Sequence, residues 1–172
     1  MRPGARVLDF CTGRGRNATA LRAAGFEVVA VADGDVDRDD ALPGAGETFA
    51  AAISTHGLLH GIPDRIDARV AAIAARLDRG GLFFATFGSI ADARFGRGTR
   101  LGPSTFAPDN GDERDVAHTY FTRAQLDDLL RRHFEIERMW EVETDAIAGS
   151  WAHARQPLHD AVHWFLVARN RN

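Results

Sequence analysis

The sequence contains no lysine, a single cysteine and no long apolar run, and each absence excludes a class of protein. All 21 basic side chains are arginine, which excludes Schiff-base chemistry and a phosphate-binding loop with its lysine. Cys11 alone cannot form an internal disulfide, and it fits a reducing cytoplasm. No stretch approaches the ~18 apolar residues of a membrane span. The first residues run directly into a strand-like segment, so we expect no signal peptide and a cytoplasmic protein.

Charge and composition are those of an ordinary globular domain. The 172 residues carry a formal net charge of −3, and 45% of them are hydrophobic. A chain of this length buries about 70% of its extended surface, which is enough for a core without disulfides or metals. We therefore expect a single domain over residues 1–172, with neither a nucleic acid nor a membrane as partner.

The first third of the sequence has the pattern of a right-handed βαβ unit. Arg6–Phe10 is a short apolar run, which predicts a strand, and the glycine turn Cys11–Gly15 follows it. Asn17–Ala24 is rich in alanine and leucine, which predicts a helix. Glu27–Ala32 predicts a second, buried strand. Parallel strands joined by a crossover helix account for this order.

The remainder predicts an α/β domain with a mostly parallel sheet. Its last two strands are joined without a helix signal, which favours an antiparallel pair at the edge of the sheet. Residues 88–117 are rich in Gly, Arg and Asp and have little periodicity, which is typical of a lid or acceptor-binding loop. The predicted strands are Phe49–Thr55, Leu82–Phe87, Phe134–Val142 and Val162–Ala168, and the predicted helices are Ile62–Leu77 and Thr122–His133.

The glycine turn after the first strand carries the strongest chemical signal. Gly13 and Gly15 let the backbone approach a ligand closely. Asp33 follows Gly13 by 20 residues, where a carboxylate at the end of the second strand can accept hydrogen bonds from ribose hydroxyls. The run G-R-G-R-N-A also matches the G-x-G-x-x-A pattern of a dinucleotide site. Asp9 favours a cationic ligand instead, because a pyrophosphate needs a helix N-terminus without a nearby anion.

The segment V-L-D-F-C-T-G-R-G-R-N (residues 7–17) resembles the first motif of class I S-adenosylmethionine-dependent methyltransferases. Its G-R-N-A continuation is similar to the tellurite-resistance-type branch of that family. Residues 50–60, 77–86 and 118–126 resemble later family segments in the same order. The resemblance implies a Rossmann-like three-layer sandwich that binds S-adenosylmethionine. It also implies methyl transfer to a small-molecule acceptor by direct in-line displacement.

The resemblance also implies roles for residues that follow the strands. Asp33 would hold the ribose, and the pair Asp40-Ala41 would meet the adenine, although Asp40 also lies in an acidic run of the kind that is usually a solvated loop. His56 would lie beside the methionine part or the acceptor, where it could act as a general base. The implied cofactor-binding set is Asp9, Gly13, Gly15, Asn17, Asp33, Asp40, Ala41 and Thr55.

Two of the departures from the family pattern concern the glycine loop and the segment after the second strand. Cys11 stands where the family has its first glycine. Only 19 residues separate Asp33 from Ile53, and the acidic segment 34–48 is too short for the helix and strand that the family fits there. We therefore expect the outer helix and strand to be missing. Glu27–Ala32 would then lie near an uncovered edge, which predicts a homodimer.

Two sets of side chains allow alternative interpretations. The pairs His56/His60 and His159/His163 are four residues apart and could bind a metal on a helix, but no cysteine or carboxylate cluster completes a zinc site, so we expect no metal. The aromatic side chains could line an acceptor pocket or belong to the core, and the arginines could pair with an anionic acceptor or with solvent. These residues include Phe95, Phe106, Tyr120, Arg94, Arg97 and Arg100.

Two other functions remain open at this point. The chain could bind S-adenosylmethionine without catalysing methyl transfer, because it lacks elements that the family normally has. A weaker alternative is a module that binds a nicotinamide dinucleotide.

Overall fold

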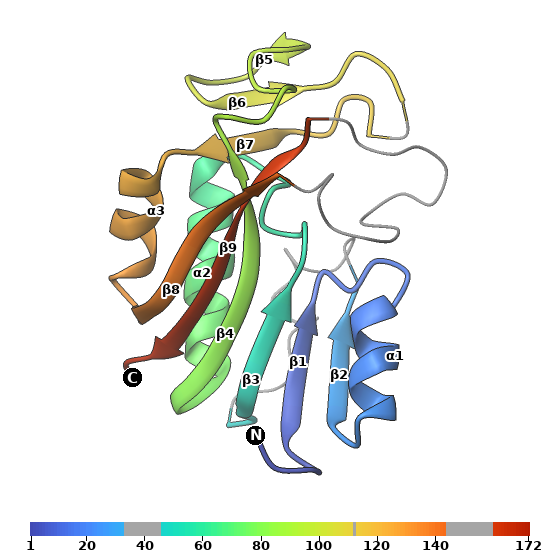
Figure 1. Cartoon of the computed structure of the whole chain (residues 1–172), viewed down its shortest axis with the longest axis vertical. Helices are drawn as coiled ribbons and strands as arrows, with labels where there is room; N and C mark the ends of the chain where they lie inside the picture. Colours follow the sequence, from blue (N-terminus) through green and yellow to red (C-terminus); the bar gives the residue numbers. More distant parts are fainter. Residues whose placement is uncertain (33–45, 112, 144–159) are drawn as a thin grey trace.

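One continuous sheet organises the chain (Figure 1). The structure is a computed structural model, and it describes residues 1–32, 46–111, 113–143 and 160–172. The elements in chain order are β1 (Arg6–Phe10), α1 (Arg16–Ala23), β2 (Glu27–Val31), β3 (Phe49–Ser54), α2 (Pro63–Arg76), β4 (Leu77–Ser89), β5 (Thr99–Arg100), β6 (Thr105–Ala107), β7 (His118–Phe121), α3 (Arg123–Leu130), β8 (Phe134–Glu143) and β9 (Val162–Asn170).

The order in which successive strands are added to the sheet reverses between β1 and β3. Strand β1 pairs in parallel with β2 on one side and with β3 on the other, and β3 pairs in parallel with β4. Right-handed crossovers therefore put α1 on one face and α2 on the opposite face. Figure 1 shows α2 passing behind β4 and β9. The carboxyl ends of β1 and β3 form the switch point at which such sheets bind ligands.

The C-terminal strands form the expected antiparallel pair. Strand β9 runs antiparallel to β4 from Leu82–Arg169 to Gly88–His163, and β8 pairs with the other edge of β9. The predicted α/β fold, with a mostly parallel sheet and an antiparallel pair, is confirmed. The predicted cap of α3 is also confirmed, because the Thr122 hydroxyl accepts from the Gln125 N–H and the Gln125 side chain accepts from the Thr122 N–H.

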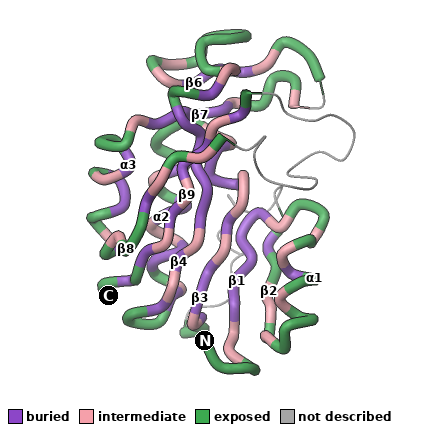
Figure 2. Tube along the Cα trace, viewed as in Figure 1, coloured by how far each residue is buried: buried purple, intermediate pink, exposed green. Residues whose placement is uncertain are grey.

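The core lies between the sheet and the helices. Figure 2 shows buried residues along β1, β3, β4 and β9, flanked by exposed helix surfaces. Helix α2 contributes Ile66, Val70 and Ile73, which are fully buried and spaced by three or four residues on one face. Pro63 begins this helix at a position where its missing N–H costs no hydrogen bond. No described helix has the length and apolar composition needed to cross a membrane.

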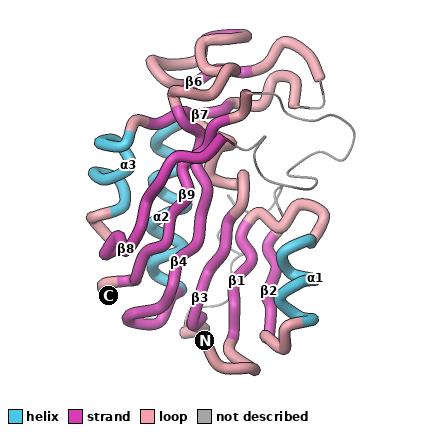
Figure 3. Tube along the Cα trace, viewed as in Figure 1, coloured by secondary structure: helices cyan, strands magenta, loops and turns pink. Residues whose placement is uncertain are grey.

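Two local expectations were wrong. Strand β2 was expected to be buried, yet only Val31 of its five residues is buried, because β2 pairs only with β1 among the described strands. The segment before α3 contains the unexpected strand β7, which pairs with the end of β4 (Figure 3). Residues 88–117 also contain the antiparallel strands β5 and β6. Most of the acidic segment 34–48 lies outside the described residues.

Candidate cofactor and acceptor site

The glycine loop forms a tight turn at the carboxyl end of β1. Gly13 and Gly15 have φ values of 53° and 74°, in the left-handed region that glycine adopts readily. The Gly15 N–H donates to the Thr12 carbonyl over 2.8 Å, and the Thr12 N–H donates to the Val31 carbonyl at the end of β2. A Cβ added to Gly15 would meet nothing within 4 Å. The loop therefore presents bare backbone beside open space.

Asp9 holds this loop to the beginning of α1. Its carboxylate is fully buried, and Oδ2 accepts hydrogen bonds from the Thr12 hydroxyl over 2.7 Å and from the Ala18 N–H over 3.0 Å. A helix N-terminus attracts an anion, and here the anion is a side chain of the protein itself. Because the Asp9 carboxylate already occupies this helix end, a dinucleotide pyrophosphate is disfavoured there. The other oxygen, Oδ1, is buried and has no hydrogen-bond partner within the described residues.

A side-chain contact joins the loops that follow β1 and β3. The Asn17 amide donates to the Thr55 hydroxyl over 2.8 Å. Cys11 has a φ of 61° and packs against Gly57, where an added Cβ would lie 2.1 Å from the Cβ of Cys11. The structure thus brings six of the predicted site residues to one edge of the sheet: Asp9, Gly13, Gly15, Asn17, Thr55 and His56. The predicted ribose and adenine residues, Asp33, Asp40 and Ala41, lie outside the described residues.

His56 is held in a strained and mostly buried position. Its φ is 68°, its N–H donates to the Thr86 hydroxyl over 2.9 Å, and its ring stacks on His163 with centroids 5.0 Å apart. Burial lowers the pKa of His56 well below its usual value, and His163 and His60 lower it further. Burial also lowers the pKa of His163, to about 4. Both rings are therefore neutral at neutral pH.

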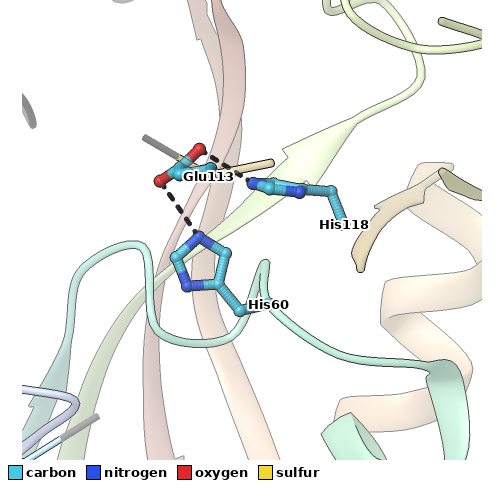
Figure 4. Close-up of side chains that lie close together, drawn as sticks. All are labelled: His60, Glu113 and His118. Carbon is cyan, nitrogen blue, oxygen red and sulfur yellow. Dashed lines mark hydrogen bonds and ion pairs between the residues drawn. The ribbon is translucent and has the colours of Figure 1, made fainter. Parts of the chain in front are cut away.

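A second cluster consists of His60, Glu113 and His118 (Figure 4). One Glu113 oxygen lies 3.4 Å from His60 Nε2, and the other lies 3.0 Å from His118 Nε2. Hydrogen bonds from the two histidines hold the pKa of Glu113 far below its usual value. This cluster was not predicted from the sequence, where only histidines four residues apart were candidates for a metal site. No local pattern connects residue 60 with residues more than fifty positions further along.

A pocket of about 380 Å³ lies over the aromatic side chains of β6 and β7. Arg94 and Arg97 line it together with Phe106 and Tyr120, whereas Arg100 does not line it. Phe95 packs edge-on against both aromatic rings. The pocket therefore combines cationic and aromatic groups. Its remaining lining residues are Gly98, Pro108, Asp109 and Asn110.

Asp92 connects this pocket to the histidines. It is buried and accepts two hydrogen bonds from the Arg94 guanidinium, of 2.6 and 2.8 Å, and one from the Val162 N–H, next to His163. Burial alone would raise the pKa of Asp92, but Arg94 outweighs it and holds the pKa below its usual value. A larger cavity of about 520 Å³ lies between α2 and α3, and none of the predicted site residues lines it.

Comparison with known proteins gives structural neighbours only. No protein-family model matches the sequence, and no curated protein matches it. A SAM-dependent methyltransferase from Methanosarcina mazei superposes with a TM-score of 0.73 over 98% of this chain and 93% of its own, at 14% identity. The 1,6-didemethyltoxoflavin N1-methyltransferase of Burkholderia thailandensis was solved with S-adenosylhomocysteine. It superposes with a TM-score of 0.66 over 98% of this chain and 72% of its own, at 22% identity. The chain thus has the Rossmann-like fold of SAM-dependent methyltransferases.

Proposed function

We propose that the protein is an S-adenosylmethionine-dependent methyltransferase that acts on a small molecule. The observation that carries the proposal is the Asp9 carboxylate, which fixes the glycine loop to α1 at the switch point of a methyltransferase fold. This arrangement leaves a bare backbone loop for the ligand. It also places a negative charge at the N-terminus of α1, where the pyrophosphate of a dinucleotide would be repelled. The neighbour from Burkholderia was solved with S-adenosylhomocysteine, which supports the same ligand class here.

The residues present fit S-adenosylmethionine. The buried oxygen Oδ1 of Asp9, which has no partner in the described part of the chain, suits the positive charge of a ligand ammonium. Gly13, Gly15 and Asn17 would border the amino-acid portion, with Thr55 on the opposite loop. In the proposal Asp33 holds the ribose, and Asp40 and Ala41 meet the adenine. When bound, the cofactor supplies a methyl group activated by a sulfonium.

His56 is the proposed proton acceptor. Burial keeps its imidazole neutral at neutral pH, so the ring is already in the form that can take a proton. The Thr86 hydroxyl fixes its backbone and His163 fixes its ring plane, so little reorganisation is needed. An acceptor hydroxyl or amine that gains a methyl group would lose its proton to this ring.

The pocket over β6 and β7 supports a small, planar, anionic acceptor. Its volume of about 380 Å³ suits a small molecule rather than a macromolecule. Phe106 and Tyr120 offer aromatic faces, and Arg97 offers a cation that an anionic group can approach. Arg94 is oriented by buried Asp92, which also holds the backbone beside His163. The pocket is thereby connected to the proposed proton acceptor.

The experiment measures turnover with a panel of small aromatic acids. The release of S-adenosylhomocysteine is the readout. We expect turnover with at least one member of the panel. Arg97→Gln should raise KM for that acceptor with little change in KM for the cofactor. Arg100→Gln is the matched control, because Arg100 does not line the pocket. Cofactor binding without turnover across the panel would favour the alternative of a non-catalytic binding domain.

A further inference from the structure

We propose that His60, Glu113 and His118 form a site for one divalent transition-metal ion of the Zn²⁺ type. His60 comes from the loop after β3, Glu113 from the segment before β7, and His118 is the first residue of β7 (Figure 4). Two imidazoles and one carboxylate are a donor set that first-row divalent metals take. None of the three belongs to the proposed cofactor-binding set, so the site stands apart from the methyl-transfer proposal.

The spacing of the ligand atoms suits a metal. With bonds of about 2.1 Å at tetrahedral or octahedral angles, neighbouring ligand atoms lie about 3.0–3.4 Å apart. The two contacts of Glu113 measure 3.0 Å to His118 Nε2 and 3.4 Å to His60 Nε2, and all three ligand atoms lie within 4.8 Å of one another. The His60 side chain is 28% exposed, so its ring has room to turn toward a shared ion.

The hydrogen bond on the far side of His118 prepares its ring as a ligand. Nδ1 lies 2.7 Å from the Val116 carbonyl oxygen, which can only accept, so Nδ1 carries a proton. Nε2 then faces the Glu113 carboxylate over 3.0 Å, and a metal ion would take the place of the proton between these two atoms. Donation from the second ring nitrogen to a carbonyl is also how metal-bound histidines are oriented.

The backbone holds the two histidines together before any ion binds. Residues 60 and 118 form an isolated antiparallel bridge, and the Gly61 N–H donates to the Ala117 carbonyl over 2.7 Å. The Thr119 N–H donates to the Leu59 carbonyl over 2.9 Å. On the other side, the buried Arg69 of α2 donates to the His60 carbonyl. Both ligands therefore lie on a braced backbone, which reduces the entropy lost on metal binding.

Three protein ligands leave at least one coordination position open. Structural zinc sites use four protein ligands, whereas sites that bind a water or a substrate oxygen use three. In the proposed site this position would take a water or a substrate oxygen.

The test is calorimetric titration of the chelator-treated protein with Zn²⁺, together with the visible spectrum of bound Co²⁺. We expect one ion per chain. Glu113→Gln, which preserves shape, and His118→Ala should each weaken Zn²⁺ binding by more than the roughly 10–100-fold that loss of an outer partner costs. His133→Ala, in the turn between α3 and β8, is the control and should bind Zn²⁺ normally.

Two results would overturn the proposal: no saturable binding by the wild-type protein, or unchanged binding in Glu113→Gln. The test does not depend on His118→Ala, because Glu113→Gln decides the outcome even if His118→Ala does not fold. Neither measurement involves S-adenosylmethionine, so failure of the metal site and failure of the methyl-transfer proposal are seen separately.

Discussion

Cys11 and Gly57 pack so closely that a Cβ at position 57 would lie 2.1 Å from the Cβ of Cys11 and 2.4 Å from its sulfur. Cys11 stands in the left-handed region, with a φ of 61°, at the place where the resembling family has its first glycine. The space that this glycine would leave is thus filled by a thiol, and the opposite loop provides the glycine instead. The pair holds together the two loops that form the candidate cofactor edge.

This relationship predicts a compensating pair of substitutions. Gly57→Ala should destabilise the protein by about 1–3 kcal/mol, because a side chain would be forced into a filled space. Cys11→Gly combined with Gly57→Ala should recover much of that loss, because it removes the thiol and the left-handed strain together. Urea unfolding of the two single variants and the double variant measures the coupling.

The control for this pair is Gly102→Ala, whose added Cβ would make only ordinary contacts of 3.6 Å. A Gly57→Ala variant as stable as this control would contradict the packing argument. So would a double variant no more stable than Gly57→Ala.

The pH dependence of methyl transfer tests the role of His56. Because burial lowers its pKa well below 6.5, the neutral base persists as the pH falls through 6.5. The rate should therefore stay level to pH values at which an ordinary histidine is already protonated. His56→Asn should lower kcat about 10²–10⁴-fold. A rate that falls through pH 6.5 in the wild type, or an unimpaired His56→Asn, would argue against the assignment.

His163 should make the folded state sensitive to mild acid. Its pKa is about 4 in the folded state, against 6.5 for an ordinary histidine, so between pH 6.5 and 5 only the unfolded chain takes up this proton. Proton uptake by the unfolded chain lowers the free energy of unfolding, here by about 1–2 kcal/mol. Glu113 contributes mainly below this window, because its unfolded carboxyl titrates near 4.5.

His163→Gln isolates this contribution. The substitution removes the titrating group, so urea unfolding across this pH range should give a shallower loss of stability than in the wild type. His56 still titrates in the variant, so part of the slope should remain. Identical slopes in the two proteins would show that His163 does not carry the effect.

Local patterns were enough to predict most of the fold. Apolar runs located the strands at Arg6–Phe10 and in the C-terminal antiparallel pair, and Thr122 located the beginning of α3. The glycine spacing located the turn that Asp9 anchors. These features depend on neighbours in the sequence, or on the alternation of one strand, which a sequence displays directly.

Features that depend on long-range pairing were not predictable in this way. Strand β7 is short, and it is a strand because the end of β4 and strand β6 lie beside it. The His60–Glu113–His118 cluster exists because the loop after β3 pairs with the beginning of β7. The fit of Cys11 to Gly57 likewise joins two loops more than forty residues apart. No residue pattern marks such contacts in a single sequence.

We expect the chain to form a homodimer through β2. This strand is the last one on its side of the described sheet, and Val28, Val29 and Ala30 are not buried. An apolar strand with a free edge favours pairing with a second copy. Light scattering should give about twice the monomer mass of 18.8 kDa. Val29→Lys should shift the mass toward the monomer more than Arg76→Glu on α2, and a monomeric wild type at micromolar concentration would contradict the prediction.

The most direct test of the account is isothermal titration calorimetry of the wild-type protein with S-adenosylmethionine, S-adenosylhomocysteine and NAD. We predict one binding site per chain for the first two ligands and no binding of NAD. Asp33→Ala should weaken cofactor binding by about 1–3 kcal/mol, or about 5- to 150-fold, through loss of a charged hydrogen bond. The control Asp78→Ala, at an exposed position, should bind like the wild type. Absence of binding to both sulfonium-derived ligands, preferential binding of NAD, or an unaffected Asp33→Ala would contradict the account.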